Sequence, residues 1–223
     1  MTHAAALAMI FDAGIVPVVR TSSAESAIRS VEALVRGGIR AAEIPMTVPG
    51  ALHALERLAD RFGDEVAIGA GTVLDGETAR NCLQAGASFL FAPCLKTEVI
   101  EVAKRESAVV MPGALTPTEV LTAWEAGADA VRIVPCDAMG GVKYIRALRA
   151  PFPQIAMAPT GGVTLENIGE YFRAGARAVG VSGALIDLHN LQSESWEVFT
   201  VRARRFVEAI RKSRELLKAN GAH

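Results

Sequence analysis

The sequence lacks the features that would direct a protein to nucleic acid, a membrane or an oxidising compartment. Its 23 lysines and arginines nearly balance 24 aspartates and glutamates, so the net charge of -1 offers no general attraction to nucleic acid or anionic lipid. The three cysteines, Cys82, Cys94 and Cys136, are odd in number and form no CxxC pair, which argues against a disulfide framework and a structural zinc site. We therefore expect a cytoplasmic protein with no nucleic-acid partner and no membrane partner.

Long apolar runs and linkers are also missing. The opening MTHAAALAMIFDAG holds a short apolar stretch without a basic leader, and it is too short to span a bilayer, so we expect an N-terminal lead-in helix. No segment rich in serine, proline or charge divides the 223 residues, of which 51% are hydrophobic. We expect a single domain over residues 1–223 with a large core.

What the sequence does contain is a repeated phrase, in which a helix ends at a glycine and an apolar strand follows. The four copies are RGGIRAAEIPM (36–46), QAGASFLFAPC (84–94), EAGADAVRIVPC (125–136) and RAGARAVGVSG (173–183). Four further apolar runs, each followed by a helical pattern, lie at 14–20, 65–73, 107–115 and 153–163. Eight alternating strand and helix units predict an α/β protein, a single (β/α)8 TIM barrel, with a flavodoxin-like open sheet as the alternative.

A charged residue, Arg132, interrupts the apolar run of GADAVRIVPCDAMGG. Burying a guanidinium is costly, so Arg132 must face a polar cavity or pair with an acid. Side chains alternate along a strand, and if Arg132 points into the barrel then Glu43 on the second predicted strand shares its cavity. This pair is either a satisfied ion pair without chemistry or a catalytic carboxylate beside an anion-binding arginine.

Glycine-rich loops end the last two predicted strands, in PTGGV (159–163) and GVSG (180–183). Barrels often build a phosphate site from the loops after strands 7 and 8, because backbone N–H groups point outward there. Tight turns alone would also explain these glycines. A phosphate site and two simple turns therefore stay open as interpretations.

Several motifs together resemble one known family. GGIRAAEIPMTVPGA, GAGTV, MPGALTPTE, GGVKYIRALRAPFPQ and PTGGV, in this order and spacing, are similar to the 2-keto-3-deoxy-6-phosphogluconate aldolases and 4-hydroxy-2-oxoglutarate aldolases. The resemblance implies a homotrimeric (β/α)8 class I aldolase, which cleaves a 2-keto acid to pyruvate and an aldehyde through a lysine Schiff base. It implies no cofactor and no metal.

The resemblance also implies roles for individual residues. Glu43 would be the general acid and base, and Thr72 and Thr160 would line the pyruvate pocket with Pro93 beside them. The backbone amides of Gly161 and Gly162 would hold the distal phosphate of the substrate.

One departure from the family concerns the nucleophile itself. The family has a lysine in a KxxP motif at the end of strand 6, whereas this sequence has Arg132 at that position and Pro135 three residues later. A guanidinium stays protonated at neutral pH and has no free lone pair, so it forms no Schiff base. We expect Arg132 to hold the substrate carboxylate or keto oxygen, or to neutralise Glu43.

Two smaller departures affect substrate binding. Many members bind the pyruvate carboxylate with an arginine where this chain has Thr47, but others have the same TVP and an arginine at the end of strand 1. This predicts carboxylate binding by Arg20, and we expect Thr47, Ser182 and Gly183 to contact the substrate as well. The family's GS dipeptide on strand 8 is reversed here as Ser182-Gly183, which weakens the expectation of phosphate specificity.

Alternative chemistries remain open from the sequence. Lys96, after the fourth predicted strand, is the one lysine of five near the expected cavity mouth, although an exposed cap at the start of the following helix explains it better. Glu43 and Asp137 would supply oxygen ligands for Mg²⁺ or Mn²⁺, which Arg132 would oppose. The functional hypotheses are a lyase with an altered mechanism, for example enolising or decarboxylating a keto acid, a barrel that binds without turnover, and an engineered scaffold.

Overall fold

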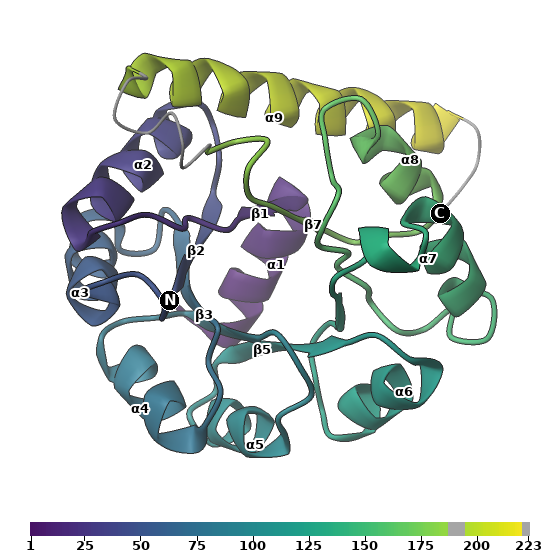
Figure 1. The fold of residues 1–223 in the computed structure, drawn as a ribbon, viewed down its shortest axis with the longest axis horizontal. Helices are drawn as coiled ribbons and strands as arrows, with labels where there is room; N and C mark the ends of the chain where they lie inside the picture. Colours follow the sequence, from purple (N-terminus) through teal and green to yellow (C-terminus); the bar gives the residue numbers. More distant parts are fainter. Residues whose placement is uncertain (187–194, 220–223) are drawn as a thin grey trace.

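The computed structural model describes residues 1–186 and 195–219, in which strands and helices alternate as predicted (Figure 1). The strands are β1 (Ile15–Pro17), β2 (Ala41–Pro45), β3 (Ala67–Gly71), β4 (Phe89–Ala92), β5 (Val109–Ala114), β6 (Arg132–Ile133) and β7 (Val179–Val181). The α-helices are α1 (His3–Ala13), α2 (Ala24–Arg36), α3 (Ala51–Phe62), α4 (Gly76–Gln84), α5 (Thr97–Arg105), α6 (Pro117–Glu125), α7 (Val142–Arg149), α8 (Ile168–Arg173) and α9 (Trp196–Ala219).

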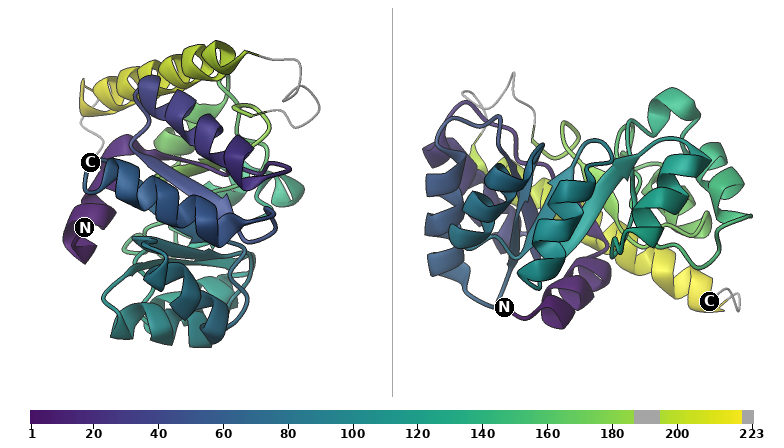
Figure 2. Two further views of the ribbon diagram at one scale, coloured as in Figure 1. Left: turned by 90° about the vertical axis from the view of Figure 1, so that its left-hand side faces the viewer. Right: turned by 90° about the horizontal axis from the view of Figure 1, so that it is seen from below.

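The strands form two parallel sheets inside a ring of helices (Figures 1 and 2). One sheet has the order β2-β3-β4-β5-β6, and the other pairs β1 with β7. Isolated parallel bridges join Val18 to Glu43, Val131 to Met157 and Thr160 to Gly180. The carboxyl ends of strands far apart in the sequence therefore face the same side of the molecule.

The segment 153–163 corrects the prediction of eight regular strands. It hydrogen-bonds on both sides, since Ala158 N donates to Val131 O at 2.9 Å and Gly180 N donates to Pro159 O at 2.9 Å, yet it forms no regular strand. Pro159 has no N–H to donate and interrupts the ladder. The parallel α/β fold is confirmed, and the seventh predicted strand is wrong as a regular element.

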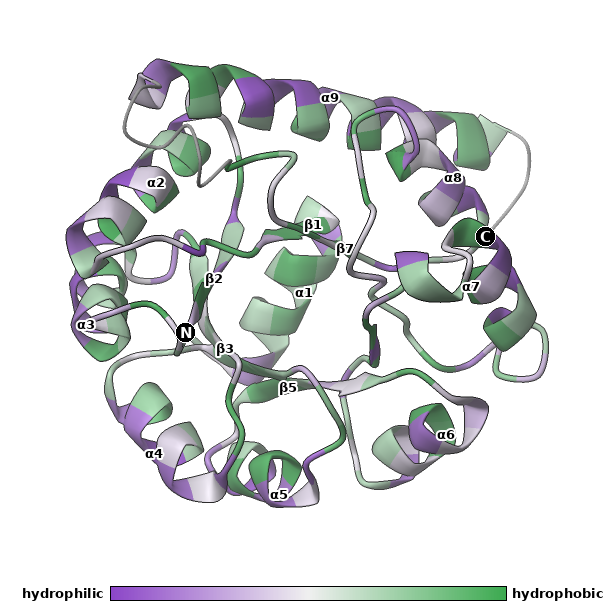
Figure 3. Cartoon of the chain, in the orientation of Figure 1, coloured by the Kyte–Doolittle hydropathy of each residue, from purple (hydrophilic) through white to green (hydrophobic). Residues whose placement is uncertain are grey.

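Local signals explain why the outer helices begin where they do. Thr116 and Glu119 form a capping box at the start of α6, where Pro117 opens the helix, and the side chains of Ser23 and Asp75 cap α2 and α4. Figure 3 shows apolar residues along the strands and a mixture of apolar and polar residues on the outer helices. The outer helices thus bury one side against the sheets and leave the other in solvent.

The predicted lead-in helix is α1, and it covers the amino ends of the strands (Figure 2). Ala6 and Ile10 are buried in an apolar cluster with inward side chains of the strands, such as Ala67 and Val109. His3 Nε2 lies 2.8 Å from Asp129 Oδ1 and ties the helix to the loop before β6. With this end covered, the accessible interior is at the carboxyl ends. No helix in the described residues is long and apolar enough to cross a membrane.

Candidate active site

A cavity of about 390 Å³ opens at the carboxyl ends of the strands. Its lining comes from nearly every strand end, and the described lining residues are Val18, Arg20, Glu43, Thr72, Phe91, Pro93, Arg132, Val134, Thr160, Gly161, Gly162, Val163, Thr164, Gly180, Ser182, Gly183 and Ala184. This is the end of a parallel α/β structure where active sites are usually built.

Arg132 lines this cavity and is 2% exposed. Its Nη1 donates to Glu43 Oε2, and its Nε donates to Thr160 Oγ1 at 2.6 Å. The guanidinium carbon lies 3.4 Å from the centroid of the Phe91 ring, which gives a cation–π contact. Arg132 is therefore both paired with an acid and turned toward a cavity, so the two explanations for a charge on this strand apply together.

Glu43 on β2 is fully buried. Burial raises the pKa of its carboxyl above the ordinary value for glutamate, against the opposing effect of the charge and hydrogen bond of Arg132 and the charge of Arg20. Its Oε2 accepts from Arg132, but its Oε1 has no hydrogen-bond partner among the described residues. A buried charged oxygen without a partner is costly, and protonation of the carboxyl lowers that cost.

Two glycines leave the space that this ion pair occupies. A Cβ at Gly71 would lie 1.7 Å from Glu43 Oε1, and one at Gly180 would lie 2.2 Å from Thr160 Oγ1 and 2.7 Å from Arg132 Nη2. Any larger residue at either position would displace the pair. The local sequence is thus adapted to hold an arginine, an acid and a hydroxyl together.

The guanidinium keeps one free donor group. Nε and Nη1 of Arg132 bond to Thr160 and Glu43, whereas Nη2 makes no hydrogen bond with any described residue. The cavity therefore offers a free donor on Arg132 beside the buried carboxyl of Glu43, whose Oε1 lies against Gly71. A ligand that carries an anionic or keto oxygen matches this donor.

The structure brings most of the predicted binding residues to this cavity. Arg20, Thr72, Pro93, Thr160, Gly161, Gly162, Ser182 and Gly183 all contribute to the lining. Thr72 adopts a left-handed backbone with φ of 57°, a strained conformation that is frequent at functional sites. Thr47 is exposed in the turn after β2 and does not line the cavity.

Phe91 is a cavity residue that we did not identify from the sequence. It lies on β4 two residues after Phe89 and two before Pro93, so alternation along the strand puts Phe91 on the same side as Pro93, which also lines the cavity. An aromatic residue in an apolar strand is usually part of the core. Only the position of the Arg132 guanidinium over its ring shows that Phe91 also makes a cation–π contact in the cavity.

The predicted phosphate loop has left-handed backbones at Gly161 and Gly162, with φ of 104° and 68°. Asn167 Nδ2 donates to Gly162 O at 2.7 Å, while Asn167 Oδ1 accepts from Thr164 N at 2.8 Å, so one side chain fixes the loop. Asp137 packs against the same glycines, since a Cβ at Gly161 would lie 2.5 Å from its Oδ1. The carboxylate of Asp137 thus lies close to the loop without lining the cavity.

No lysine lines the cavity in the described part of the chain, which includes all five lysines of the sequence. Lys96 is the N-cap residue of α5, and its Nζ lies 3.2 Å from Glu98 Oε1. Lys143 lies on α7. Across the described residues, no three His, Cys, Asp or Glu side chains gather as they would around a metal ion.

The cysteines near the strand ends differ in exposure. Cys94 is exposed, whereas Cys136 is buried, and burial raises the pKa of its thiol to about 11. A thiol with so high a pKa stays protonated at neutral pH and is a poor nucleophile.

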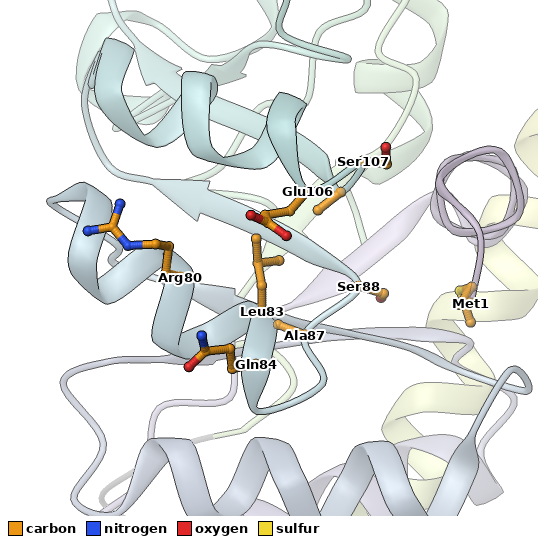
Figure 4. A pocket seen from close by; sticks show the side chains of 9 residues that line it. Met1, Arg80, Leu83, Gln84, Ala87, Ser88, Glu106 and Ser107 are labelled. Atoms are coloured by element: carbon orange, nitrogen blue, oxygen red, sulfur yellow. The ribbon is translucent and has the colours of Figure 1, made fainter.

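A second cavity, of about 320 Å³, lies at the opposite, amino end of β4 and β5 (Figure 4). Figure 4 shows Arg80, Leu83 and Gln84 on α4, with Glu106 and Ser107 at the end of α5. Its polar groups do not converge on a buried charge as those around Arg132 do. We therefore place the candidate active site at the carboxyl ends.

Comparisons with known proteins show the family of this chain. The family model "KDPG and KHG aldolase" matches residues 8–201. The 2-dehydro-3-deoxy-6-phosphogalactonate aldolase of Escherichia coli K12 is 35% identical over 200 residues, which cover 89% of this chain and 95% of that protein. The 2-dehydro-3-deoxy-phosphogluconate aldolase of Dickeya dadantii is 32% identical over 194 residues, covering 86% and 90%.

Solved structures are similar over the same extent. A native KDPGal structure superposes with a TM-score of 0.83 at 33% identity, covering 90% of this chain and 96% of the other. The KDPG aldolase of Legionella pneumophila, solved with pyruvate captured as a covalent carbinolamine, has a TM-score of 0.81 at 28% identity and covers 89% and 96%. A cube-shaped cage designed by fusing symmetric oligomeric domains has a TM-score of 0.85 at 32% identity, covering 93% and 76%.

Proposed function

This chain belongs to the KDPG and KHG aldolase family, and from that membership we propose that it cleaves a 2-keto acid to pyruvate and an aldehyde in the cavity at the carboxyl ends of its strands. The observation that carries the proposal is the buried pair of Glu43 and Arg132, because each keeps an unpaired polar atom. A carboxyl with a raised pKa beside a free guanidinium donor is what proton transfer and oxyanion binding require.

The proposed mechanism uses no Schiff base. Arg132 occupies the position at which we predict the family's nucleophilic lysine, and none of the five lysines reaches the cavity. A guanidinium is a poor nucleophile but a strong hydrogen-bond donor to an oxyanion. Arg132 therefore stabilises the negative charge that forms on the keto oxygen during cleavage. In a Schiff-base mechanism the imine nitrogen would take up this charge instead.

Each bond change can be assigned to a residue. The Glu43 carboxylate removes the proton from the C4 hydroxyl, the C3–C4 bond breaks, and the aldehyde leaves. The electron pair moves into C2–C3 and places the negative charge on the keto oxygen, which Arg132 Nη2 holds. Glu43 then returns its proton to C3, and pyruvate forms. The raised pKa of Glu43 favours its acid form for this last step.

The other cavity residues bind and orient the substrate. Arg20 faces its carboxylate, and Thr72 and Thr160 lie on either side of the keto group. Gly161 and Gly162 hold the distal end, which we propose is phosphorylated because the relatives are aldolases of phosphorylated keto acids. These assignments follow from the family resemblance and from the shared cavity.

A second function is favoured by the same ion pair. Because Arg132 and Glu43 already satisfy each other in part, the barrel would also serve to bind or enolise a keto acid without cleaving it. The distinction lies in whether pyruvate is released.

The decisive experiment combines turnover with covalent trapping. Pyruvate release from 2-dehydro-3-deoxy-6-phosphogalactonate and 2-dehydro-3-deoxy-6-phosphogluconate is followed with a coupled reductase, and the protein is incubated with pyruvate and borohydride before intact-mass measurement. We expect slow release, lost in Glu43→Gln, and no adduct. Arg132→Lys should gain a borohydride adduct at the new lysine.

Other outcomes reject defined parts of the proposal. A stoichiometric adduct in the unaltered chain, mapped to Lys96 or another lysine, would overturn the mechanism and keep the activity. Pyruvate binding without release from either substrate would support the second function. Arg132→Met serves as the control, since it removes the guanidinium without adding an amine.

We further propose a single-domain, closed ring of eight strand positions, a cytoplasmic location and a homotrimer. The three isolated bridges support the ring, and the similarity to symmetric oligomeric domains of a designed cage supports self-association. Light scattering after size-exclusion chromatography tests the trimer: we expect three times the chain mass of 23.5 kDa, and a monomer would contradict it.

A further inference from the structure

A larger cavity, of about 690 Å³, lies at the amino end of the strands, where the ends of α1 and α8 meet the last turns of α9. Figure 1 shows α8 beneath this part of α9. We call it the basic cavity because five of its described lining residues carry positive charge, namely Arg149, Arg173, Arg177, Arg214 and Lys218. Asp12 is the one carboxylate among the described lining residues.

None of these five cations forms an ion pair with a carboxylate among the residues that the structure describes. Other arginines of the chain do, since Arg61 lies 3.0 Å from Glu32 and Arg211 lies 2.7 Å from Glu215. The chain as a whole carries almost no net charge. The excess of positive charge is therefore a local property of the basic cavity.

Several of the guanidinium groups are held in place before any ligand arrives. Arg177 stacks on the Phe11 ring at 5.0 Å, and Arg214 stacks on Phe172 at 5.3 Å while donating to the carbonyl oxygens of Phe11 and Asp12. Arg149 Nη1 donates to Pro153 O at 2.5 Å. Side chains fixed in this way lose less conformational entropy when they bind a ligand.

The carbonyl ends of nearby helices explain only part of the charge. α1, α7, α8 and α9 all end at or near the basic cavity, and each end carries about half a negative charge. The four helix ends together carry about two negative charges, and Asp12 adds one more. These charges offset about three of the five positive charges and leave an excess of about two. Burial lowers the pKa of Arg214; the charge of Asp12 opposes this effect, and the charge of Arg177 adds a smaller lowering.

We propose that the basic cavity binds a small anion carrying more than one phosphate group. The remaining charge requires a multiply charged partner, and guanidinium and ammonium groups are the usual donors to phosphate oxygens. A recess of this volume accommodates a small molecule. The site is separate from the keto-acid cavity, because the two share no lining residue.

Calorimetric titration of the full chain with inorganic pyrophosphate at low ionic strength tests this proposal, with orthophosphate as the weaker competitor. We expect one pyrophosphate per chain, and affinity about tenfold lower in Arg177→Ser and in Lys218→Ser, since each removes a charged donor. Arg204→Ser should bind like the unaltered chain, because Arg204 is an exposed arginine of α9 outside the basic cavity. Unchanged melting temperatures show that the variants fold.

Binding at the other end of the molecule is a distinguishable outcome. Arg20→Ser alters the keto-acid cavity, and we expect pyrophosphate binding to survive it. Loss of binding in Arg20→Ser with no change in Arg177→Ser would place the anion at the carboxyl ends and overturn the proposal. If pyrophosphate binding does not saturate below about 10 mM, the proposal is also overturned. The five cations would then only neutralise the negative charge of the nearby helix ends.

Discussion

Arginine has different surroundings at the two ends of the strands. At the carboxyl end, Arg132 is 2% exposed and contacts a carboxylate, a hydroxyl and an aromatic ring. At the amino end, Arg173 and Arg177 are exposed and have no carboxylate partner in the described structure. Both groups line cavities, but only one of them is buried.

The difference follows from the cost of desolvation. A guanidinium removed from water needs several partners to offset its lost hydration, so burial selects a specific acid and a specific hydroxyl around Arg132. Water screens exposed arginines, and they tolerate one another until an anion binds. A buried charge held by specific partners thus defines a shaped site, whereas an exposed cluster without carboxylate partners offers mainly an electrostatic field.

The largest expected effect comes from removing the buried arginine. Arg132→Met leaves the Glu43 carboxyl buried without its partner and should lower the free energy of unfolding by about 3–5 kcal/mol in urea titrations. Arg204→Ser, an exposed control, should change it by less than about 0.5 kcal/mol. Equal effects of the two variants would show that the ion pair is not desolvated. The double variant Glu43→Gln/Arg132→Met should recover part of the loss.

A smaller loss should follow from filling the space beside the ion pair. Gly180→Ala places a Cβ 2.2 Å from Thr160 Oγ1 and should cost about 1–3 kcal/mol of unfolding free energy. Gly183→Ala, three residues later, meets nothing within 4 Å and should be nearly neutral. Thermal unfolding of both variants checks this, and a stable Gly180→Ala would mean that the pair shifts without strain.

The aromatic ring under Arg132 should matter less again. Phe91→Leu removes the cation–π contact while keeping an apolar side chain, and the Kd for pyruvate should rise about fivefold, equivalent to about 1 kcal/mol. Phe91→Tyr keeps the aromatic face and should bind pyruvate nearly as well as the unaltered chain. Calorimetric titration measures both values. Similar losses in the two variants would assign Phe91 to packing alone.

The smallest effect is expected at the exposed end. Arg177→Ser should change the free energy of unfolding by less than about 0.5 kcal/mol, because an exposed arginine contributes little to stability. Urea titrations at low and high salt measure this. A loss comparable with that of Arg132→Met would remove the contrast between the two ends.

The sequence predicted the cavity better than its closest contacts. Strand alternation placed Glu43 and Arg132 on a common interior, and the structure confirms that they face each other. Alternation did not distinguish an ion pair from a catalytic pair, and the sequence analysis did not identify Phe91 as a cavity residue. Thr47 follows β2 closely but turns outward, because the chain forms a turn directly after Pro45.

By itself, the sequence determined the alternation of strands and helices, the resemblance to aldolases and the prediction that Arg132 stands where the family has a lysine. All three features depend on residue type and on spacing along the chain, and both can be read from the sequence without knowing the packing. The tertiary structure alone decided which partners surround Arg132, since Glu43 is 89 residues away and Thr160 is 28. Distances between strands depend on how the sheets and helices pack, and no pattern along one strand encodes them.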